Sequence, residues 1–223
     1  MPGRRQVRLG RCVMAPLAQF RLRSRLAGAA RQYIAADWPV ASGAWWDAAE
    51  QRYRCDQAEC VTQGLHPTLP GAASILRRCQ VSVAGAATPD LASVAGRWSQ
   101  RPYSLLLPTG HSCDVLELGV ATVRRVRAYL DAGPAATLPD GRVLLFTTVA
   151  AAHDDDLGAE LSRVGALHHS HGSWVPLPPS QLATGPVRWS RSPGAAGWRL
   201  PSPYQVAHAL RAALSAVAPA EGR

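Results

Sequence analysis

Two cysteines and a histidine lie close together in the first half of the chain, in the pattern Cys55-x4-Cys60-x5-His66. Thiolate sulfur and imidazole nitrogen are ligands that Zn²⁺ prefers, and thiols stay available for it in a reducing compartment. Tetrahedral closure needs a fourth ligand, for which the sequence offers Cys79 and Asp56. The spacing therefore predicts either a structural zinc site or a metal-free loop with reduced thiols.

The second half of the chain holds a histidine cluster and an acidic run. His169 and His171 would share one face of an extended segment, where they could bind a metal as a pair. We interpret them, with His168, as part of a solvated loop before Gly172 instead. Residues 154–156 are three aspartates, which we interpret as the solvated start of a helix, because the helix dipole favours carboxylates there.

Serine and tryptophan offer two other kinds of site. Ser180 is a candidate nucleophile, but no G-x-S-x-G elbow surrounds it, which argues against a serine hydrolase. Trp45 and Trp46 are the one pair that we consider as a stacking platform for bases, with burial in the core as the alternative.

The composition describes a globular protein. The chain has 223 residues and a hydrophobic share of 47 %, which suffices for one cored domain with extensions. No apolar run approaches the roughly 20 residues of a bilayer span, so a membrane protein is excluded. The sequence has no secretion signal, and its cysteine count of 5 is odd. We therefore expect a cytoplasmic protein without a disulfide framework.

The positive charge is concentrated at the N-terminus. The net charge is +9, but residues 1–31 hold eight arginines and no acid, while the rest holds 16 arginines against 15 acids. Residues 1–23 are interpreted as a basic, disordered arm, as sequence upstream of a true start near Met14, or as a phosphate-binding arm. Residues 24–217 form the predicted domain, and residues 218–223 form a tail.

The apolar periodicity predicts alternating helices and strands. Helices are expected from Ser24, after Pro89-Asp90, over 119–131, near 156–164 and from Pro201. Strands are expected over 38–42, 104–109, 113–118, 142–148, 173–177 and 186–190. The pattern indicates an α/β or α+β fold whose mixed sheet is flanked by helices. Residues 43–73, which contain the cysteines, are expected to be an irregular insertion.

Several segments occur in an order that is typical of one family. They are AARQYIAADWPV, CDQAECVTQGLHP, SLLLPTG, DVLELG, DGRVLLF, GSWVPLPPS, TGPVRW and WRLP, and the region that they mark covers about residues 26–215. In these segments the chain resembles the N-terminal domain of bifunctional DNA primase/polymerases, of the archaeo-eukaryotic primase superfamily. It looks most like short stand-alone members from high-GC bacteria. The resemblance implies a primase/polymerase-like fold and nucleotidyl transfer that depends on Mg²⁺ or Mn²⁺.

The catalytic pattern that the resemblance implies is mostly missing. The family has two aspartates two residues apart on a strand, a histidine on the next strand and a third acid. Here these positions fall on Glu117 and Gly119, on Val143 and on His168. Asp114 lies three residues before Glu117, on the opposite face of a strand. We therefore expect Glu117 to be the sole remaining motif acid, which makes a poor Mg²⁺ site.

The resemblance also suggests what the domain binds. Arg142, Ser180, Arg188 and Arg199 fall on or beside the segments that would face a nucleotide. We expect a catalytically degenerate primase/polymerase-like protein that binds nucleotide, nucleic acid or a replication partner weakly and in a salt-sensitive way. The alternatives are an active, divergent nucleotidyltransferase and a zinc-stabilised protein-interaction module.

Overall fold

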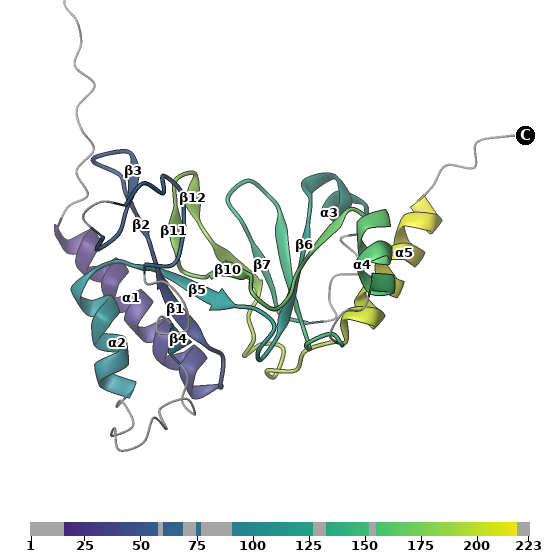
Figure 1. Ribbon diagram of the computed structural model, residues 1–223, viewed down its shortest axis with the longest axis horizontal. Coiled ribbons are helices and arrows are strands. Elements are labelled where there is room, and N and C mark those ends of the chain that lie inside the picture. Colours follow the sequence, from purple (N-terminus) through teal and green to yellow (C-terminus); the bar gives the residue numbers. More distant parts are fainter. Residues whose placement is uncertain are drawn as a thin grey trace, which may run out of the picture.

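The computed structural model describes residues 16–57, 60–68, 75–76, 91–126, 133–151 and 155–217. These residues form an α+β fold with two main antiparallel sheets, two short β-ribbons and five helices (Figure 1). The predicted fold class is confirmed. The strand pairings in these ranges are all antiparallel, whereas the sequence predicted a mixed sheet.

In the N-terminal half one helix packs against a four-stranded sheet, and a second helix packs mainly on the first (Figure 1). The helices are α1 (Pro16–Ala35) and α2 (Leu91–Gln100). The strands, in spatial order, are β10 (Trp174–Leu177), β5 (Ser104–Pro108), β1 (Val40–Gly43) and β4 (Ile75–Leu76). Helix α1 begins at Pro16, and proline is favoured in the first turn because a backbone N–H there would have no partner within the helix.

Helix α1 begins eight residues before the predicted start at Ser24. Its buried stripe begins at Leu26 and continues through Ala30, Tyr33 and Ile34. The first turns are exposed, with Leu17 and Phe20 facing solvent, so no apolar periodicity marks them in the sequence. The predicted arm therefore overlaps the start of this helix, and only residues 1–15 of it lie outside the described ranges.

A small ribbon replaces part of the predicted irregular segment. Strands β2 (Trp45–Asp47) and β3 (Arg52–Arg54) pair in register Trp46↔Tyr53. Asp47 turns the ribbon by accepting hydrogen bonds from the backbone N–H groups of Ala49 and Glu50. Strands of three residues are too short to show an alternating pattern, which is why the sequence did not reveal them.

The C-terminal half is a five-stranded sheet with three helices on its outer face (Figure 1). In spatial order its strands are β13 (Arg188–Arg191), β7 (Ala135–Thr137), β8 (Val143–Thr147), β6 (Asp114–Leu118) and β9 (Ala166–His169). The helices are α3 (Val120–Val126), α4 (Asp155–Arg163) and α5 (Pro203–Val217). The ribbon of β11 (Gln181–Leu182) and β12 (Gly185–Pro186) connects β10 to β13.

Strand β7, which the sequence analysis did not predict, explains the antiparallel order. It lies between α3 and β8 in the chain and joins β8 through a hairpin. This extra strand adds one reversal of direction, so β8 runs antiparallel to β6 instead of parallel to it. Helix α4 then carries the chain across to β9, on the other side of β6.

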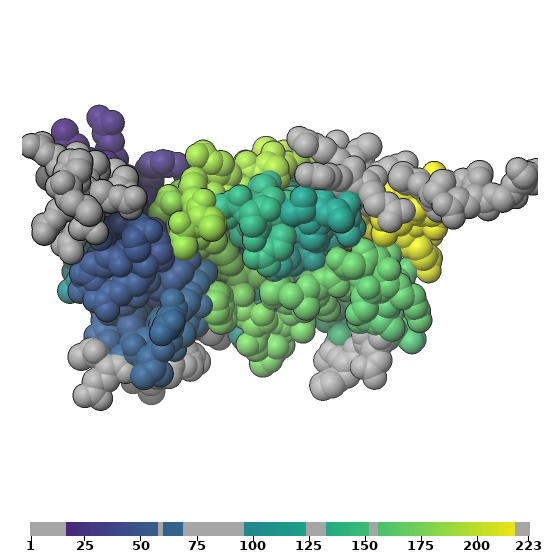
Figure 2. Space-filling view, turned by 90° about the horizontal axis from the view of Figure 1, so that it is seen from above, coloured from purple at the N-terminus to yellow at the C-terminus, as the bar shows by residue number. Residues whose placement is uncertain are grey.

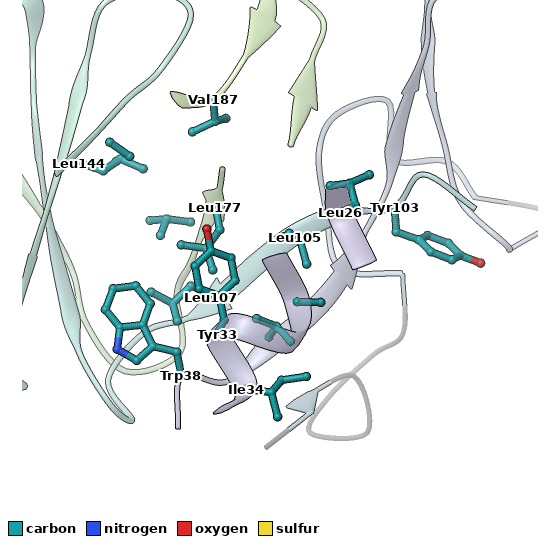
Figure 3. Close-up of a cluster of buried hydrophobic side chains, with 14 of the residues drawn as sticks. Leu26, Tyr33, Ile34, Trp38, Tyr103, Leu105, Leu107, Leu144, Leu177 and Val187 are labelled. Carbon is teal, nitrogen blue, oxygen red and sulfur yellow. The ribbon is translucent and has the colours of Figure 1, made fainter. Parts of the chain in front are cut away.

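The two sheets share one aromatic core between them (Figure 3). Leu105 and Leu107 of β5 meet Leu144 and Phe146 of β8 there, and Trp38 stacks on Phe146. A second core lies between the other face of the five-stranded sheet and helices α4 and α5. The central strands β8 and β6 are thus covered on both faces along most of their length, whereas the edge strands β13 and β9 are partly exposed.

Along the described residues, no helix is both long and apolar enough to cross a lipid bilayer. The two halves lie at opposite ends of the molecule, with α1 and α2 at one end and α5 at the other (Figures 1 and 2).

Candidate functional site

Two sites merit attention, one in each half. In the N-terminal half, ligand atoms of Cys55, Cys60 and His66 all lie within 4.8 Å of one another, and the three residues are partly buried. A hydrogen bond orients the ring of His66, because its Nδ1–H donates to the Gly64 carbonyl at 2.7 Å. Its Nε2 therefore carries the lone pair and accepts from the Cys60 thiol at 3.3 Å. This tautomer is the one that binds metal through Nε2.

The backbone around this cluster is anchored to strand β1. Ala44 N–H donates to the His66 carbonyl at 2.8 Å, and Thr68 N–H donates to the Ser42 carbonyl at 2.9 Å. The buried hydroxyls of Ser42 and Thr68 also hydrogen-bond to each other at 2.7 Å. His66 is thereby held in place by the sheet, which prepares the site for a ligand.

The two thiols differ in their environment. Partial burial raises the pKa of Cys55, whereas a backbone hydrogen bond at Thr62 lowers the pKa of Cys60. Asp56, one of the two predicted fourth ligands, is engaged elsewhere: Tyr103 donates to it, and Arg101 and Arg97 pair with it at 3.4 and 3.8 Å. The other, Cys79, lies outside the described residues.

The second site surrounds Glu117 on β6. Its Oε2 accepts from His169 Nε2 at 2.9 Å, and its Oε1 forms an ion pair with Arg142. Arg142 also donates from Nε to Asp140 Oδ2 at 2.7 Å. On the other side of the imidazole, His169 Nδ1 lies 3.0 Å from Ser173 Oγ. One carboxylate thus connects a guanidinium to an imidazole and, through it, to a hydroxyl.

The charges of this cluster stabilise one another. The hydrogen bond from His169 and the charge of Arg142 lower the pKa of Glu117, although burial opposes the shift. At Asp140, burial is likewise outweighed by the hydrogen bonds from Arg142, and the pKa is lowered. Both carboxylates are therefore ionised at neutral pH. The two carboxylates and the guanidinium of the cluster together carry a formal charge of about −1.

The strand register explains which predicted residues face Glu117. Positions Val143 and His168, implied by the family resemblance, lie on the two strands beside β6. Val143 packs into the core under the helices, and His168 pairs with Asp114 on that same face. Side chains alternate along a strand, so the neighbours Arg142 and His169 share the face of Glu117 instead.

The solvated loop expected at His168 and His169 is wrong, because both residues belong to strand β9 and are partly buried. Asp114 behaves as expected, since it lies on the opposite face from Glu117. It is fully buried, and its Oδ2 accepts from His168 Nε2 and from the Ala150 N–H, each at 2.9 Å.

The other candidate residues do not come together with Arg142. Ser180 is buried, where its hydroxyl accepts from Leu105 N–H at 2.7 Å and donates to the Leu105 carbonyl. Arg188 is exposed on β13, paired with Thr137 on the face opposite to Arg142. Arg199 is exposed in the loop between β13 and α5. The four residues thus do not form one continuous surface.

The tryptophan pair borders a pocket of about 290 Å³ in the N-terminal half. The pocket lies between α1, the end of α2 and the β2–β3 ribbon, and Arg54 and Arg101 also line it. Trp45 is buried, with Arg101 over its ring at 5.6 Å, while Trp46 packs edge-on against Tyr53. Trp45 is therefore part of the pocket wall and not an open stacking platform.

Within the ranges that the structure covers, the Cys55–Cys60–His66 group is the only one whose His, Cys, Asp and Glu side chains are close enough to hold a metal ion together. The Glu117 cluster does not meet that condition. No match to this chain was found among family models, curated proteins or solved structures.

Proposed function

We propose that this chain is a primase/polymerase-like domain that binds nucleic acid but does not transfer nucleotides. The observation that carries the proposal is the position of Arg142 between Glu117 and Asp140. Nucleotidyl transfer needs divalent metals that bridge carboxylates and the phosphates of the incoming nucleotide. Here the guanidinium of Arg142 forms ion pairs with the carboxylates that a metal would need, and Gly119 supplies no second motif acid.

The two halves of the molecule also differ in the charge of their candidate binding surfaces. The Glu117 cluster has a formal charge of about −1, which disfavours a phosphate beside it. Helix α1 holds four arginines and no acid, and residues 1–15 add four more arginines. Phosphate contacts supply most of the affinity of sequence-independent binding. Nucleic acid is thus expected on the N-terminal half, around α1 and the pocket beside it.

Two assays test this proposal on the full chain. Primer synthesis and primer extension with Mg²⁺ or Mn²⁺ should both be absent. A fluorescently labelled single-stranded oligonucleotide should bind with an affinity that falls steeply with salt. Incorporation that disappears in Glu117→Ala would favour the divergent nucleotidyltransferase instead, and an absence of binding at low salt would favour the protein-interaction module.

We further infer that Cys55, Cys60 and His66 bind a zinc ion. Two thiolates and one imidazole form a soft donor set, which suits Zn²⁺ far better than Mg²⁺ or Ca²⁺. The lowered pKa of Cys60 and the lone pair on His66 Nε2 support this assignment, because metal binding requires the deprotonated forms. Zinc here would tie the loop after β3 to strand β1.

Elemental analysis of protein purified without chelator tests the assignment, with about one zinc per chain as the expected result. Chelation should lower the melting temperature by several degrees. Cys60→Ser should remove the zinc, whereas Cys113→Ser, at a buried thiol of the C-terminal half, should leave the zinc content unchanged. Zinc content far below one per chain would favour the metal-free thiol loop.

A further inference from the structure

A chain of hydrogen bonds joins a serine, a histidine and a glutamate where the backbone crosses from one sheet to the other. Ser173 lies in the turn between β9, in the five-stranded sheet, and β10, in the four-stranded sheet. Its Oγ is 3.0 Å from His169 Nδ1, and His169 Nε2 is 2.9 Å from Glu117 Oε2. A nucleophile, a base and an orienting acid within such distances are the parts of a hydrolytic triad.

The positions of the protons in this hydrogen-bonded series follow from its acceptors. The Glu117 carboxylate is ionised and can only accept, so the proton of a neutral His169 must be on Nε2. Nδ1 then carries the lone pair, and the Ser173 hydroxyl must be the donor. The serine proton therefore already points to a base. The two ring nitrogens have exchanged the roles that they have in most triads, which is chemically equivalent because either nitrogen can act as the base.

The surrounding contacts hold the geometry in place. Glu117 presents one oxygen to His169, while Arg142 holds the other and Asp140 holds Arg142. The Ser173 carbonyl accepts from Thr109 N–H at 3.0 Å, and its N–H donates to Ser170 at 3.1 Å. Both the acid and the nucleophile are thus positioned by other residues, as an active serine requires.

We propose that Ser173 is a nucleophile that hydrolyses activated carboxylic esters, with His169 as general base and Glu117 as the residue that positions His169. Ser173 Oγ attacks the carbonyl carbon while its proton passes to His169 Nδ1. The bond to the alcohol oxygen then breaks, and His169 returns the proton to that oxygen. Water repeats the same steps on the acyl-serine, which releases the carboxylic acid and restores the hydroxyl.

Strand β9, which carries His169, indicates the class of ester. Leu167 lies directly opposite Glu117 in the register, on the face of His169, and its side chain is 57 % exposed. It offers an apolar contact for an acyl chain. The negative formal charge of the cluster disfavours anionic substrates. A neutral ester with an apolar acyl group is therefore the expected substrate, and this expectation is independent of nucleic-acid binding by the N-terminal half.

A fluorophosphonate probe tests the proposal on the full chain. Ser173 Oγ attacks phosphorus and fluoride leaves, so mass spectrometry of the labelled protein should find the phosphonyl group on the peptide that contains Ser173. The wild type should also release p-nitrophenol from p-nitrophenyl butyrate. His169→Gln should slow labelling by about 100-fold or more, because a general base contributes about that much.

The matched variants are Ser173→Ala and Ser170→Ala, which alter two serines of the same turn. Ser173→Ala should abolish labelling and ester hydrolysis, while Ser170→Ala should retain both, with melting temperatures confirming that each variant is folded. Wild-type protein that is not labelled, or a label mapped to any other residue, would overturn the proposal. Both results come from the wild type, so they do not depend on how well a variant folds.

Discussion

Removing the guanidinium of Arg142 tests how the Glu117 cluster is stabilised. The Glu117 side chain is 13 % exposed and that of Arg142 is 45 % exposed. An exposed ion pair contributes about 0.2–1 kcal/mol, and breaking a buried one costs about 3–5 kcal/mol. This pair lies between the two cases, so Arg142→Gln should lower the free energy of unfolding by about 1–2 kcal/mol at pH 7. For a domain of this size the melting temperature should fall by about 2–8 °C.

The pH dependence of this loss identifies its cause. The pKa of Glu117 is lowered below its ordinary value of 4.5, so its contribution to stability is present above that pH and is lost as the pH falls through the folded-state pKa. Asp140 behaves in the same way below its ordinary value of 3.8. The difference between the wild type and Arg142→Gln should therefore shrink as the pH falls below about 4.5.

Urea unfolding of both proteins at several pH values between 3.5 and 7 measures this difference. Arg188→Gln is the matched control, because Arg188 is an exposed arginine on the other face of the same sheet. The control should change the free energy of unfolding by no more than about 0.5 kcal/mol. Equal stability of the wild type and Arg142→Gln at pH 7, or a difference that does not change with pH, would refute the electrostatic explanation.

Three further predictions concern other parts of the molecule. Ser180→Ala should lower the free energy of unfolding by about 1–3 kcal/mol in urea, because it removes both buried hydrogen bonds to Leu105, and it should leave oligonucleotide affinity unchanged; weaker binding would restore Ser180 as a ligand contact. Gly110→Ala should cost about 2 kcal/mol or more in the same assay, because φ is 78° and the new Cβ would lie 2.2 Å from His171 Cα; an unchanged midpoint would contradict this close packing. Deleting residues 1–15 should flatten the salt dependence of single-strand binding by about 0.7 in log–log slope per lost phosphate contact; an unchanged slope would assign binding to α1 and the pocket alone.

The sequence was most informative where strands are long and covered on both faces. The apolar run at 104–109 and the segment 142–148 both became central strands, at Ser104–Pro108 and Val143–Thr147. The missed strands β2, β3 and β7 have three residues each, which are too few positions to show a period. Strand β7 was missed in this way, and the antiparallel order of the whole sheet depends on it.

Glu117 and Arg142 were placed on or beside the correct strands, but the face that they share with His169 was not predicted. Glu117 was identified as the remaining motif acid, and it is the centre of the cluster. Arg142 was predicted only as a phosphate contact, and His169 as part of a loop. Which neighbour faces Glu117 depends on the pairing register, and a shift of one residue moves every side chain to the other face. The sequence contains no direct signal for that register.

Ser173 was missed for a related reason. A strand–turn–helix elbow around a serine is the sequence pattern that predicts a nucleophile, and Ser180 lacks it. The contact between His169 and Ser173 arises instead because β9 ends where the chain turns toward the other sheet, which brings residues four apart in sequence within 3.0 Å. Only the three-dimensional path of that turn distinguishes Ser173 from its exposed neighbour Ser170.

The lack of nucleotidyl transfer and the esterase activity are both proposals, and both are argued from the neighbours of Glu117. A guanidinium neutralises a carboxylate through directional N–H bonds, but it cannot share its coordination sphere with two phosphate oxygens as a divalent metal does. Arg142 therefore supports the ionised state of Glu117 without supporting nucleotidyl transfer. Activation of a hydroxyl has different requirements: an ionised acid, an imidazole oriented by it and a serine within reach. Arg142 binds one oxygen of Glu117 and leaves the other to His169, so in these two proposals the same ion pair would exclude a metal and position the base for Ser173.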